Sequence, residues 1–267
     1  AGLSRDQVMP VIPSNQRVFT RADAVTFFFL STGGWTLQWG FVIGIVLGLA
    51  RLLFIGSLAL AQWLRSRRRE RAHAGEEYAP FVSIIVPAYN EELVVENTIN
   101  SLLASDYANY EIIVVDDGST DDTSKVVSER FGENPRVQLL TVSNAGKAAA
   151  LNSGLRLASG EVIVALDADT IFAPETVGAL ARRFAEKNVG AVAGNAKVGN
   201  RINLVTRWQA LEYITSQNMD RRAFASLDCI TVVPGAVGAW RKDLLLAVGG
   251  FESDTLAEDQ DLTLRIR

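Results

Sequence analysis

The chain has 267 residues, with 26 basic and 30 acidic side chains and a formal net charge of -4. This balance argues against a nucleic-acid partner, which favours a strongly basic surface. The single cysteine, Cys229, excludes an internal disulfide and a thiolate metal cluster. His73 is the only histidine and lies in an arginine-rich run, so a histidine-based triad or zinc site is also excluded.

Residues 1–38 are expected to form an extracytoplasmic linker or the tail of a missing domain. Two prolines, Pro10 and Pro13, fall within the first 23 residues, which show neither helical nor strand periodicity. The chain lacks an initial methionine and stops inside an expected helix, LTLRIR, so we expect it to be a fragment.

Residues 39–64, WGFVIGIVLGLARLLFIGSLALAQWL, are predicted to form a transmembrane helix. At about 1.5 Å per residue they extend roughly 39 Å, enough to cross a hydrocarbon core of about 30 Å. Arg51 opposes this prediction, since a central charge costs roughly 2.5–3.5 kcal/mol. It shares a helical face with glycines at four-residue spacing from Gly40, so we expect it to face another helix or a polar groove. The alternatives are a buried helix of a soluble protein and a span that begins near Val25.

Residues 65–79 are expected to be a basic cytoplasmic linker. Five arginines lie directly after the predicted span, between Arg65 and Arg71. Arginine clusters stay on the cytoplasmic side of a membrane, so the chain is expected at the cell membrane with its large domain in the cytoplasm. The alternative is a solvated basic linker without topological meaning.

Residues 80–267 show the pattern of an α/β domain. Short β-branched runs alternate with helical segments, which is typical of a mostly parallel sheet covered by helices. Pro87 is expected to end the first strand, because proline cannot donate to a central ladder. Ligands of such sheets bind beyond the carboxyl ends of the strands. The expected strands are residues 81–86, 111–115, 137–142, 161–166 and 189–193.

Helices are expected between these strands and after them. The first runs over residues 92–104, where Leu93, Val94, Thr98 and Leu102 have helical spacing. A longer amphipathic helix is expected over residues 203–222. Residues 232–239 are small and are expected to let a ligand approach the backbone.

Three acidic groups punctuate the domain: Asp116–Asp117, Asp167 with Asp169, and Glu258–Asp259. Asp167 and Asp169 alternate after a β-branched strand, so their carboxylates are expected to point the same way. Together they offer hard oxygen ligands for Mg²⁺ or Mn²⁺. Short Asp-x-Asp runs also serve as turn caps, which is the alternative.

Three further side chains are candidates for binding or catalysis. Asp116 can accept a hydrogen bond from a base or ribose, or else cap the next helix. Lys147 follows a glycine at a helix start, which is typical of a phosphate contact, although a surface lysine is the alternative. Asp259 is a candidate general base, or an acid favoured by a helix dipole.

In this order, the motifs strongly resemble those of family 2 glycosyltransferases over about residues 81–267. The apolar N-terminal helix, Gly194-Asn195 and the QALEY run at residues 209–213 look like the processive subset, which makes chitin, hyaluronan or poly-N-acetylglucosamine. The motifs are VPAYNE at 86–91, VDDGSTD at 115–121, KAAALN at 147–152, DAD at 167–169 and ED at 258–259.

The resemblance implies a GT-A-like fold, with a mostly parallel twisted sheet flanked by helices. It implies inverting transfer of a sugar, most simply N-acetylglucosamine, from a UDP-sugar to a growing β-linked polysaccharide or oligosaccharide acceptor. Asp259 would be the catalytic base, and Asp169 with Asp167 would hold Mg²⁺ or Mn²⁺. The nucleotide sugar would contact Pro87, Tyr89, Glu91, Asp116, Lys147 and Asp167. The sugar or acceptor side would comprise Gly235, Ala236, Gln209, Glu212, Tyr213 and Glu258.

One feature departs from the processive pattern. Those synthases carry a Gln-x-x-Arg-Trp motif and further membrane helices after the final acidic pair, and this chain stops before them. A non-processive transferase to a lipid carrier and a membrane-tethered nucleotide-sugar-binding regulator without turnover therefore stay open as alternatives. A phospho-receiver domain is disfavoured, because the acidic pair follows the second strand rather than the first.

Overall fold

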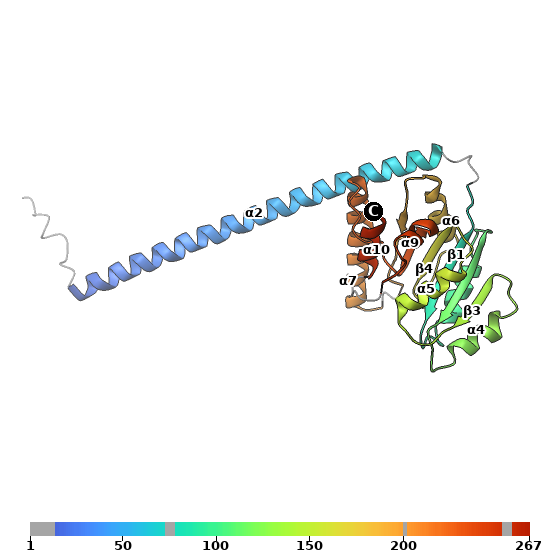
Figure 1. The fold of residues 1–267 in the computed structure, drawn as a ribbon. Helices are drawn as coiled ribbons and strands as arrows, with labels where there is room; N and C mark the ends of the chain where they lie inside the picture. The colour runs from blue at the N-terminus through green and yellow to red at the C-terminus, as the bar shows by residue number, and fades with distance from the viewer. Residues whose placement is uncertain (1–13, 73–77, 200–201, 253–257) are drawn as a thin grey trace, which may run out of the picture. The chain divides into compact units, whose positions relative to one another are not determined.

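The computed structural model describes residues 14–72, 78–199, 202–252 and 258–267 (Figure 1). The chain divides into two compact units, Ala1–Ser57 and Leu58–Arg267. Helix α2, Ser14–Ala72, begins in the first unit and ends in the second. The expectation of irregular structure up to residue 23 is therefore wrong from residue 14 onward, because no proline follows Pro13 until residue 80. Residues 1–13 lie outside the described part.

In the first unit, the large apolar side chains of α2 between Val25 and Phe54 are exposed. The segment Asp23–Arg68 has 46 residues and a mean hydropathy of 2.3 in its most apolar window, so it qualifies by length and composition to cross a membrane. It contains the predicted span. A Cβ added at Gly40, Gly44 or Gly48 would meet no atom within 4 Å, and Arg51 is exposed. The face on which we expect Arg51 to meet another helix is thus open within the described chain.

The second unit is built on a six-stranded sheet with the order β3-β2-β1-β4-β6-β5. Strands β3, β2, β1 and β4 pair in parallel, whereas β6 runs antiparallel to β4 and to β5. The expected mostly parallel sheet is confirmed. Its order changes direction between β1 and β4, which is where open α/β sheets bind ligands. The bounds are β1 Val82–Ala88, β2 Tyr110–Asp116, β3 Val137–Thr141, β4 Val162–Leu166, β5 Ala191–Ala193 and β6 Val237–Arg241.

Helices pack on both faces of this sheet (Figure 1). Each face of the sheet has its own apolar core, and alternate strand residues point into one core or the other. Ile84 and Ile112 face the α3 side, while Ile85 and Ile113 face the α5 side, and all four are fully buried. Burial on both faces explains why these strands are continuous apolar runs. One face carries α3 Val95–Leu103, α4 Thr123–Phe131 and α6 Thr176–Ala181, and the other carries α5 Lys147–Leu157, α9 Lys242–Ala247 and α10 Glu258–Ile266.

The remaining helical segments are η1, Arg182–Ala185, and a continuous run after β5. That run consists of α7 Leu204–Tyr213, the π-helical η2 Ile214–Asp220 and α8 Arg221–Ser226. It extends past the expected end at residue 222. The helix expected from residue 92 begins at Val95 instead, and Leu93, assigned to its apolar face, is 84% exposed.

Pro87 lies inside β1 rather than after it, contrary to expectation. Ala88 accepts a hydrogen bond from Asp117 of the β2 end at 2.9 Å, so the neighbouring residue, Pro87, directs its nitrogen away from β2. On that other side the β1–β4 ladder has already ended at the Ile85–Ala165 pair. The missing N–H of Pro87 therefore removes no ladder bond.

Strand β6 was not expected from the sequence. It begins at Val237, so it takes up only the end, residues 237–239, of the small-residue stretch that we had assigned to ligand approach. At this strand small residues serve packing: a Cβ on Gly238 would collide with the indole of Trp240, and a Cβ on Gly194, directly after β5, would collide with Val237. Trp240 is fully buried in the core beneath α5 and α10.

Helix α5 rests directly on the sheet at Gly154, which generates a stability prediction. A Cβ there would lie 2.5 Å from Cγ2 of Ile85 and 3.1 Å from Cγ2 of Val115. We expect Gly154→Ala to destabilise the domain, because overpacking costs about 1–3 kcal/mol against at most about 1 kcal/mol gained in helix propensity. Denaturant-induced unfolding measures the change.

Gly178→Ala on α6 is the matched control. Its added Cβ would meet the movable end of the Arg182 side chain, at 3.1 Å, so stability should be unchanged or higher. Equal unfolding midpoints for the two variants would contradict the tight α5–sheet contact.

Candidate active site

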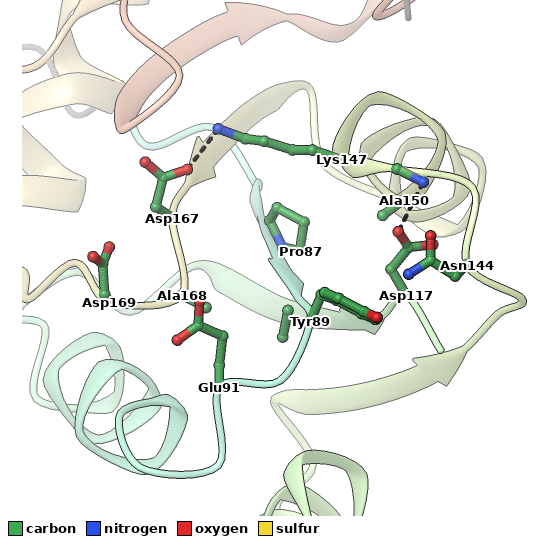
Figure 2. Close-up of a pocket in the computed structure, with 12 residues that line it drawn as sticks. Pro87, Tyr89, Glu91, Asp117, Asn144, Lys147, Ala150, Asp167, Ala168 and Asp169 are labelled. Carbon is green, nitrogen blue, oxygen red and sulfur yellow. Dashed lines mark hydrogen bonds and ion pairs between the residues drawn. The ribbon is translucent and has the colours of Figure 1, made fainter. Parts of the chain in front are cut away.

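A pocket of about 480 Å³ opens at the carboxyl ends of β1, β2 and β4, beside the start of α5 (Figure 2). It thus lies at the point where the strand order changes direction. Five of the predicted nucleotide-sugar residues line it together: Pro87, Tyr89, Glu91, Lys147 and Asp167. Asp169 of the predicted metal site joins them. The other lining residues are Ala88, Asp117, Asn144, Gly146, Ala150 and Ala168.

The loops after β1 and β2 hold one another, and this contact positions Tyr89 and Glu91. Asn90 stands between them in a left-handed conformation, φ 57°. Its side-chain oxygen accepts a hydrogen bond from the Thr120 N–H at 2.8 Å, while the Glu91 N–H donates to Thr123 Oγ1 at 2.8 Å. These bonds fix the rim of the pocket from both loops.

Asp117, rather than Asp116, stands at the pocket wall. Asp116 is 2% exposed, and its carboxylate accepts hydrogen bonds from a backbone N–H of the next turn and from the Ser124 hydroxyl of α4. Asp117 accepts from the N–H groups of Ala145 and Gly146, at 2.9 and 2.8 Å, and so shapes the loop before α5. Asp116, predicted to hold the base, is absent from the pocket lining. Asp117 was not among the predicted nucleotide-sugar residues.

Lys147 spans the mouth of the pocket to Asp167, with 2.6 Å between Nζ and Oδ1 (Figure 2). Both side chains are more than a third exposed, at 37% and 39%. Ion pairs this accessible contribute about 0–1 kcal/mol, so Lys147 can exchange this carboxylate for a phosphate at little cost. Gly146 precedes it at φ 91°, a conformation that favours glycine.

Carboxylates crowd the β1–β4 side of the pocket. Burial first, and then the negative charges of Asp169, Asp121 and Asp167, raise the pKa of Glu91 above its usual 4.5. A cation bound here would relieve that repulsion, and carboxylate oxygens suit Mg²⁺ or Mn²⁺. Within the described ranges, no group of three or more His, Cys, Asp or Glu side chains is placed to hold a metal. The donor set therefore fits an ion that takes its other ligands from water and phosphate.

The expected strand alternation does not carry Asp167 and Asp169 into the pocket. Strand β4 ends at Leu166, and the next residues form a turn in which the Thr170 N–H donates to the Asp167 carbonyl at 3.0 Å. Both carboxylates nevertheless line the pocket. A turn rather than a strand brings them there.

Asp259 is placed on another element, in the first turn of α10, and is absent from the pocket lining. Its Oδ2 accepts a hydrogen bond from the Gly235 N–H at 2.7 Å. A Cβ on Gly235 would lie 2.7 Å from Oδ1, so the approach needs glycine. Asp259, the predicted base, and Gly235, predicted for the sugar or acceptor side, are thus brought together, with Ala236 next in sequence. The side chain of Glu258 lies outside the described part.

The predicted acceptor residues of α7 are not gathered at this pocket. Gln209 and Glu212 are exposed, and Tyr213 is half-buried. Tyr213 lines a separate small pocket of about 30 Å³ that also includes Asn195 and Asn218. Asn144, which does line the larger pocket, belonged to no motif; its place follows from the loop that Asp117 holds.

Known proteins match both the sequence and the fold. Poly-beta-1,6-N-acetyl-D-glucosamine synthase of Staphylococcus epidermidis is 32% identical over 181 residues, covering 67% of this chain and 43% of that protein. The synthase of the same name from Staphylococcus aureus strain COL is 28% identical over 179 residues, with the same coverage. The chain therefore spans less than half the length of these curated relatives.

Two solved structures share the architecture. The mannosyltransferase PcManGT from Pyrobaculum calidifontis, solved with GDP-Man and Mn²⁺, gives a TM-score of 0.60 at 27% identity, covering 79% of this chain and 63% of that one. Staphylococcus aureus TarS 1-349, solved with UDP-GlcNAc, gives 0.53 at 24% identity, covering 70% and 53%. The expected GT-A-like α/β fold is confirmed. Residues 83–245, more than half of the chain, match the glycosyl transferase family 2, and the chain belongs to that family.

Proposed function

We propose that this chain transfers a sugar, most simply N-acetylglucosamine, from a UDP-sugar to a growing β-linked polysaccharide, with inversion at the anomeric carbon. The observation that carries this proposal is the pocket at the β1–β4 switch point, where a lysine and strand-end carboxylates converge in a family 2 chain. The similarity to synthases named for poly-β-1,6-N-acetylglucosamine supports the choice of sugar.

The nucleotide would bind between the β1 loop and the loop before α5. Pro87 and Tyr89 form one wall, and the half-exposed ring of Tyr89 offers a surface on which a base can stack. Asp117 and Asn144 line the same pocket from the loops after β2 and before α5 and supply hydrogen-bond acceptors and donors. Asp116, predicted to hold uracil directly, would instead fix the turn that carries Asp117.

The diphosphate would lie near the start of α5, where the Lys147 ammonium and the positive end of the helix dipole favour negative charge. Asp169, with Asp167, would hold a Mg²⁺ or Mn²⁺ ion, and Glu91 stands beside them. When bound, such an ion neutralises the charge that develops on departing UDP. Lys147 would leave Asp167 and contact the phosphates, which frees that carboxylate for the metal.

Asp259 would act as the general base. Its carboxylate takes the proton of the acceptor hydroxyl while the hydroxyl oxygen attacks the anomeric carbon, and the bond from that carbon to UDP breaks. The Gly235 N–H holds one carboxylate oxygen and leaves the other available. The sugar and acceptor would then lie along Gly235 and Ala236. Gln209, Glu212, Tyr213 and Glu258 stay predictions for the acceptor side.

The chain would work at the cell membrane. Residues 39–64 would cross it, residues 65–79 would form the basic cytoplasmic linker, and residues 80–267 would form the cytoplasmic catalytic domain. Residues 1–38 would lie outside. The arginines after Leu64 support this orientation, and labelling from each side of the membrane with an impermeant reagent checks it.

The first prediction concerns donor binding. Asp169→Asn is expected to weaken UDP binding in the presence of Mn²⁺ by about tenfold or more, because a metal ligand is lost, while metal-free UDP binding changes little. Isothermal titration with UDP, with and without Mn²⁺, measures both. Glu129→Gln removes a charge from the exposed surface of α4 and should bind as the unmodified chain does. Equal Mn²⁺ dependence in both variants would remove Asp169 from the metal site.

The second prediction concerns the transfer step. Asp259→Asn is expected to lower sugar transfer by about a hundredfold or more, because an amide cannot take the acceptor proton, while UDP affinity is kept. Product formation from radiolabelled UDP-N-acetylglucosamine, by membranes carrying the chain, measures it. Product size separates a polymer from a single sugar on a lipid carrier. No product from the unmodified chain, with UDP still bound, would favour a binding regulator.

The third prediction follows from the raised pKa of Glu91. Below pH 4.5 the Glu91 carboxyl is protonated in both the folded and the unfolded chain, so it does not lower the free energy of unfolding. As pH rises through the raised folded pKa, the native state must ionise Glu91 beside other acids, and stability is lost. Without metal, Glu91→Gln should therefore unfold at a higher temperature than the unmodified chain at pH 7, and this advantage should vanish below pH 4.5.

Thermal unfolding in EDTA at both pH values measures the effect. Glu129→Gln again serves as the control, since its difference from the unmodified chain should not depend on pH. An advantage of Glu91→Gln that persists at low pH would show that charge repulsion is not its cause.

A further inference from the structure

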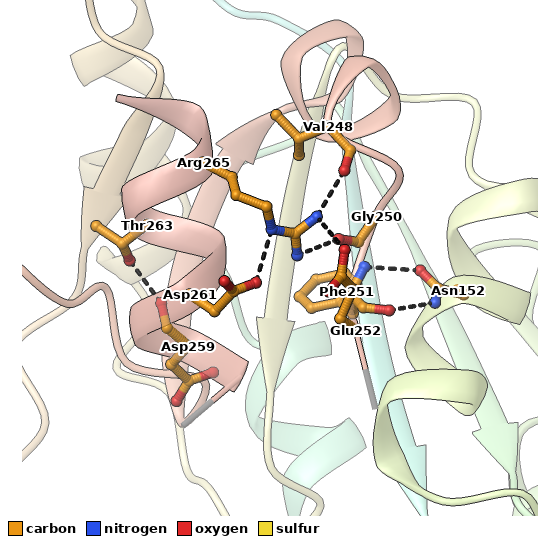
Figure 3. A network of polar contacts seen from close by, with 9 residues as sticks. All are labelled: Asn152, Val248, Gly250, Phe251, Glu252, Asp259, Asp261, Thr263 and Arg265. Atoms are coloured by element: carbon orange, nitrogen blue, oxygen red, sulfur yellow. Dashed lines mark hydrogen bonds and ion pairs between the residues drawn. The ribbon is translucent and has the colours of Figure 1, made fainter. Parts of the chain in front are cut away.

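A short segment joins the two halves of the proposed site. Residues 248–252, here called the strap, connect α9 with the chain that leads to α10 (Figure 3). Asn152 of α5 pairs with it at Phe251: the side-chain Nδ2 donates to the Phe251 carbonyl at 2.7 Å, and Oδ1 accepts from the Phe251 N–H at 3.0 Å. One amide side chain thus satisfies both backbone groups of Phe251, as a neighbouring strand would.

The packing around this pair leaves little freedom. Gly250 has φ 81°, and a Cβ there would collide with Asn152 Oδ1, so glycine is needed for the approach. The Phe251 ring is 4% exposed and stands edge-on to Trp240, with 5.7 Å between ring centroids. The strap is therefore fixed to α5 and to the core together.

Arg265 of α10 holds the same strap from the opposite side (Figure 3). Its guanidinium donates to the Val248 carbonyl at 2.5 Å and to the Gly250 carbonyl at 3.1 Å. It also bonds Asp261 Oδ2 at 2.6 Å and lies 3.1 Å from Glu252 Oε1. Only a planar fork with several donors can make these contacts at once.

The two anchors belong to the helices that carry the proposed chemistry. Helix α5 begins at Lys147, which lines the donor pocket, and α10 carries Asp259 in its first turn. Within α10 the Asp259 carbonyl accepts a hydrogen bond from Thr263 Oγ1 at 2.7 Å. Thr263 Oγ1 in turn accepts from the Val233 N–H at 2.8 Å, which ties this helix to the segment before β6. The strap is thus a polar bridge from the donor helix to the helix of the base.

We propose that Asn152 and Arg265 are positioning residues for sugar transfer, which set Asp259 of α10 relative to the donor held at the start of α5. This role presupposes the proposed transferase function. Neither residue lines the donor pocket, so each acts through the strap rather than on the substrate. Small displacements of a reacting group suffice to slow a reaction, by about a hundredfold for 1 Å.

Two conservative variants test this role in the full chain. Asn152→Asp keeps the size and the bond from the Phe251 N–H, but places an acceptor against the Phe251 carbonyl. Arg265→Lys keeps the charge but cannot bridge the strap and Asp261 together. For both, kcat for transfer should fall by about tenfold to a hundredfold, while the Kd for UDP with Mn²⁺ stays within about twofold. The double variant should lose less than the product of the single losses, because both act on one segment.

The control is a polar network at the amino ends of the strands. Buried Glu111 accepts hydrogen bonds from Ser83 Oγ at 2.6 Å and from the Ser159 N–H at 2.7 Å. Glu111→Gln should lower the unfolding temperature without changing kcat of the folded protein. Should Asn152→Asp and Arg265→Lys behave like Glu111→Gln, with lower stability but unchanged kcat, the positioning role is overturned. A loss of UDP affinity equal to the loss in kcat would overturn it too.

Asp259→Asn, assayed alongside, separates this inference from the proposed function. Unaltered transfer by Asp259→Asn would reject the base itself. Transfer that is lost in Asp259→Asn but retained in Asn152→Asp and Arg265→Lys would reject only the bridge.

Discussion

The site depends on the parallel pairing of β1 with β2 on one side and β4 on the other. Because all three strands are buried on both faces, their register cannot slip without moving apolar side chains between two separate cores. The carboxyl ends of the three strands therefore lie at one edge of the sheet, and the loops that follow them meet at that edge. The pocket is a consequence of this register rather than of any single loop.

Charge at that edge is balanced only in part. Lys147 offsets the charge of Asp167. The pKa of Glu91 is nevertheless raised, first by burial and then by the negative charges of its acidic neighbours, Asp169 among them. A domain that keeps carboxylates together accepts a cost to folding, which is typical of sites arranged for a ligand rather than for stability. The accessible Lys147–Asp167 pair fits this view, since a weak pair is easily exchanged for a phosphate or a metal.

The pocket, which we propose as the donor half of the site, was largely predictable from sequence, because strand ends and the glycine before Lys147 are local signals. The errors there were also local. Pro87 was excluded from its strand because the early end of the β4 ladder has no sequence signature. Asp116 was preferred to Asp117, and neighbouring residues at a strand end point to opposite sides, so only the register decides which of them faces the pocket. Strand β6 was missed because its glycine, Gly238, reflects a contact with Trp240 that is formed only on folding.

The proposed acceptor half depends on contacts between residues far apart in the chain, which no local sequence pattern predicts. Asp117 organises the loop before α5 across 28 residues of chain, whereas Asn152 reaches Phe251 across 99. Closing a longer loop costs more entropy, so such a contact persists only when it satisfies groups that would otherwise be buried without partners. The strap meets this condition, since Asn152 pairs both backbone groups of Phe251 while its ring fills the core. Under the proposed role of the strap, the place of Asp259 would follow from that long-range contact, which sequence spacing alone does not show.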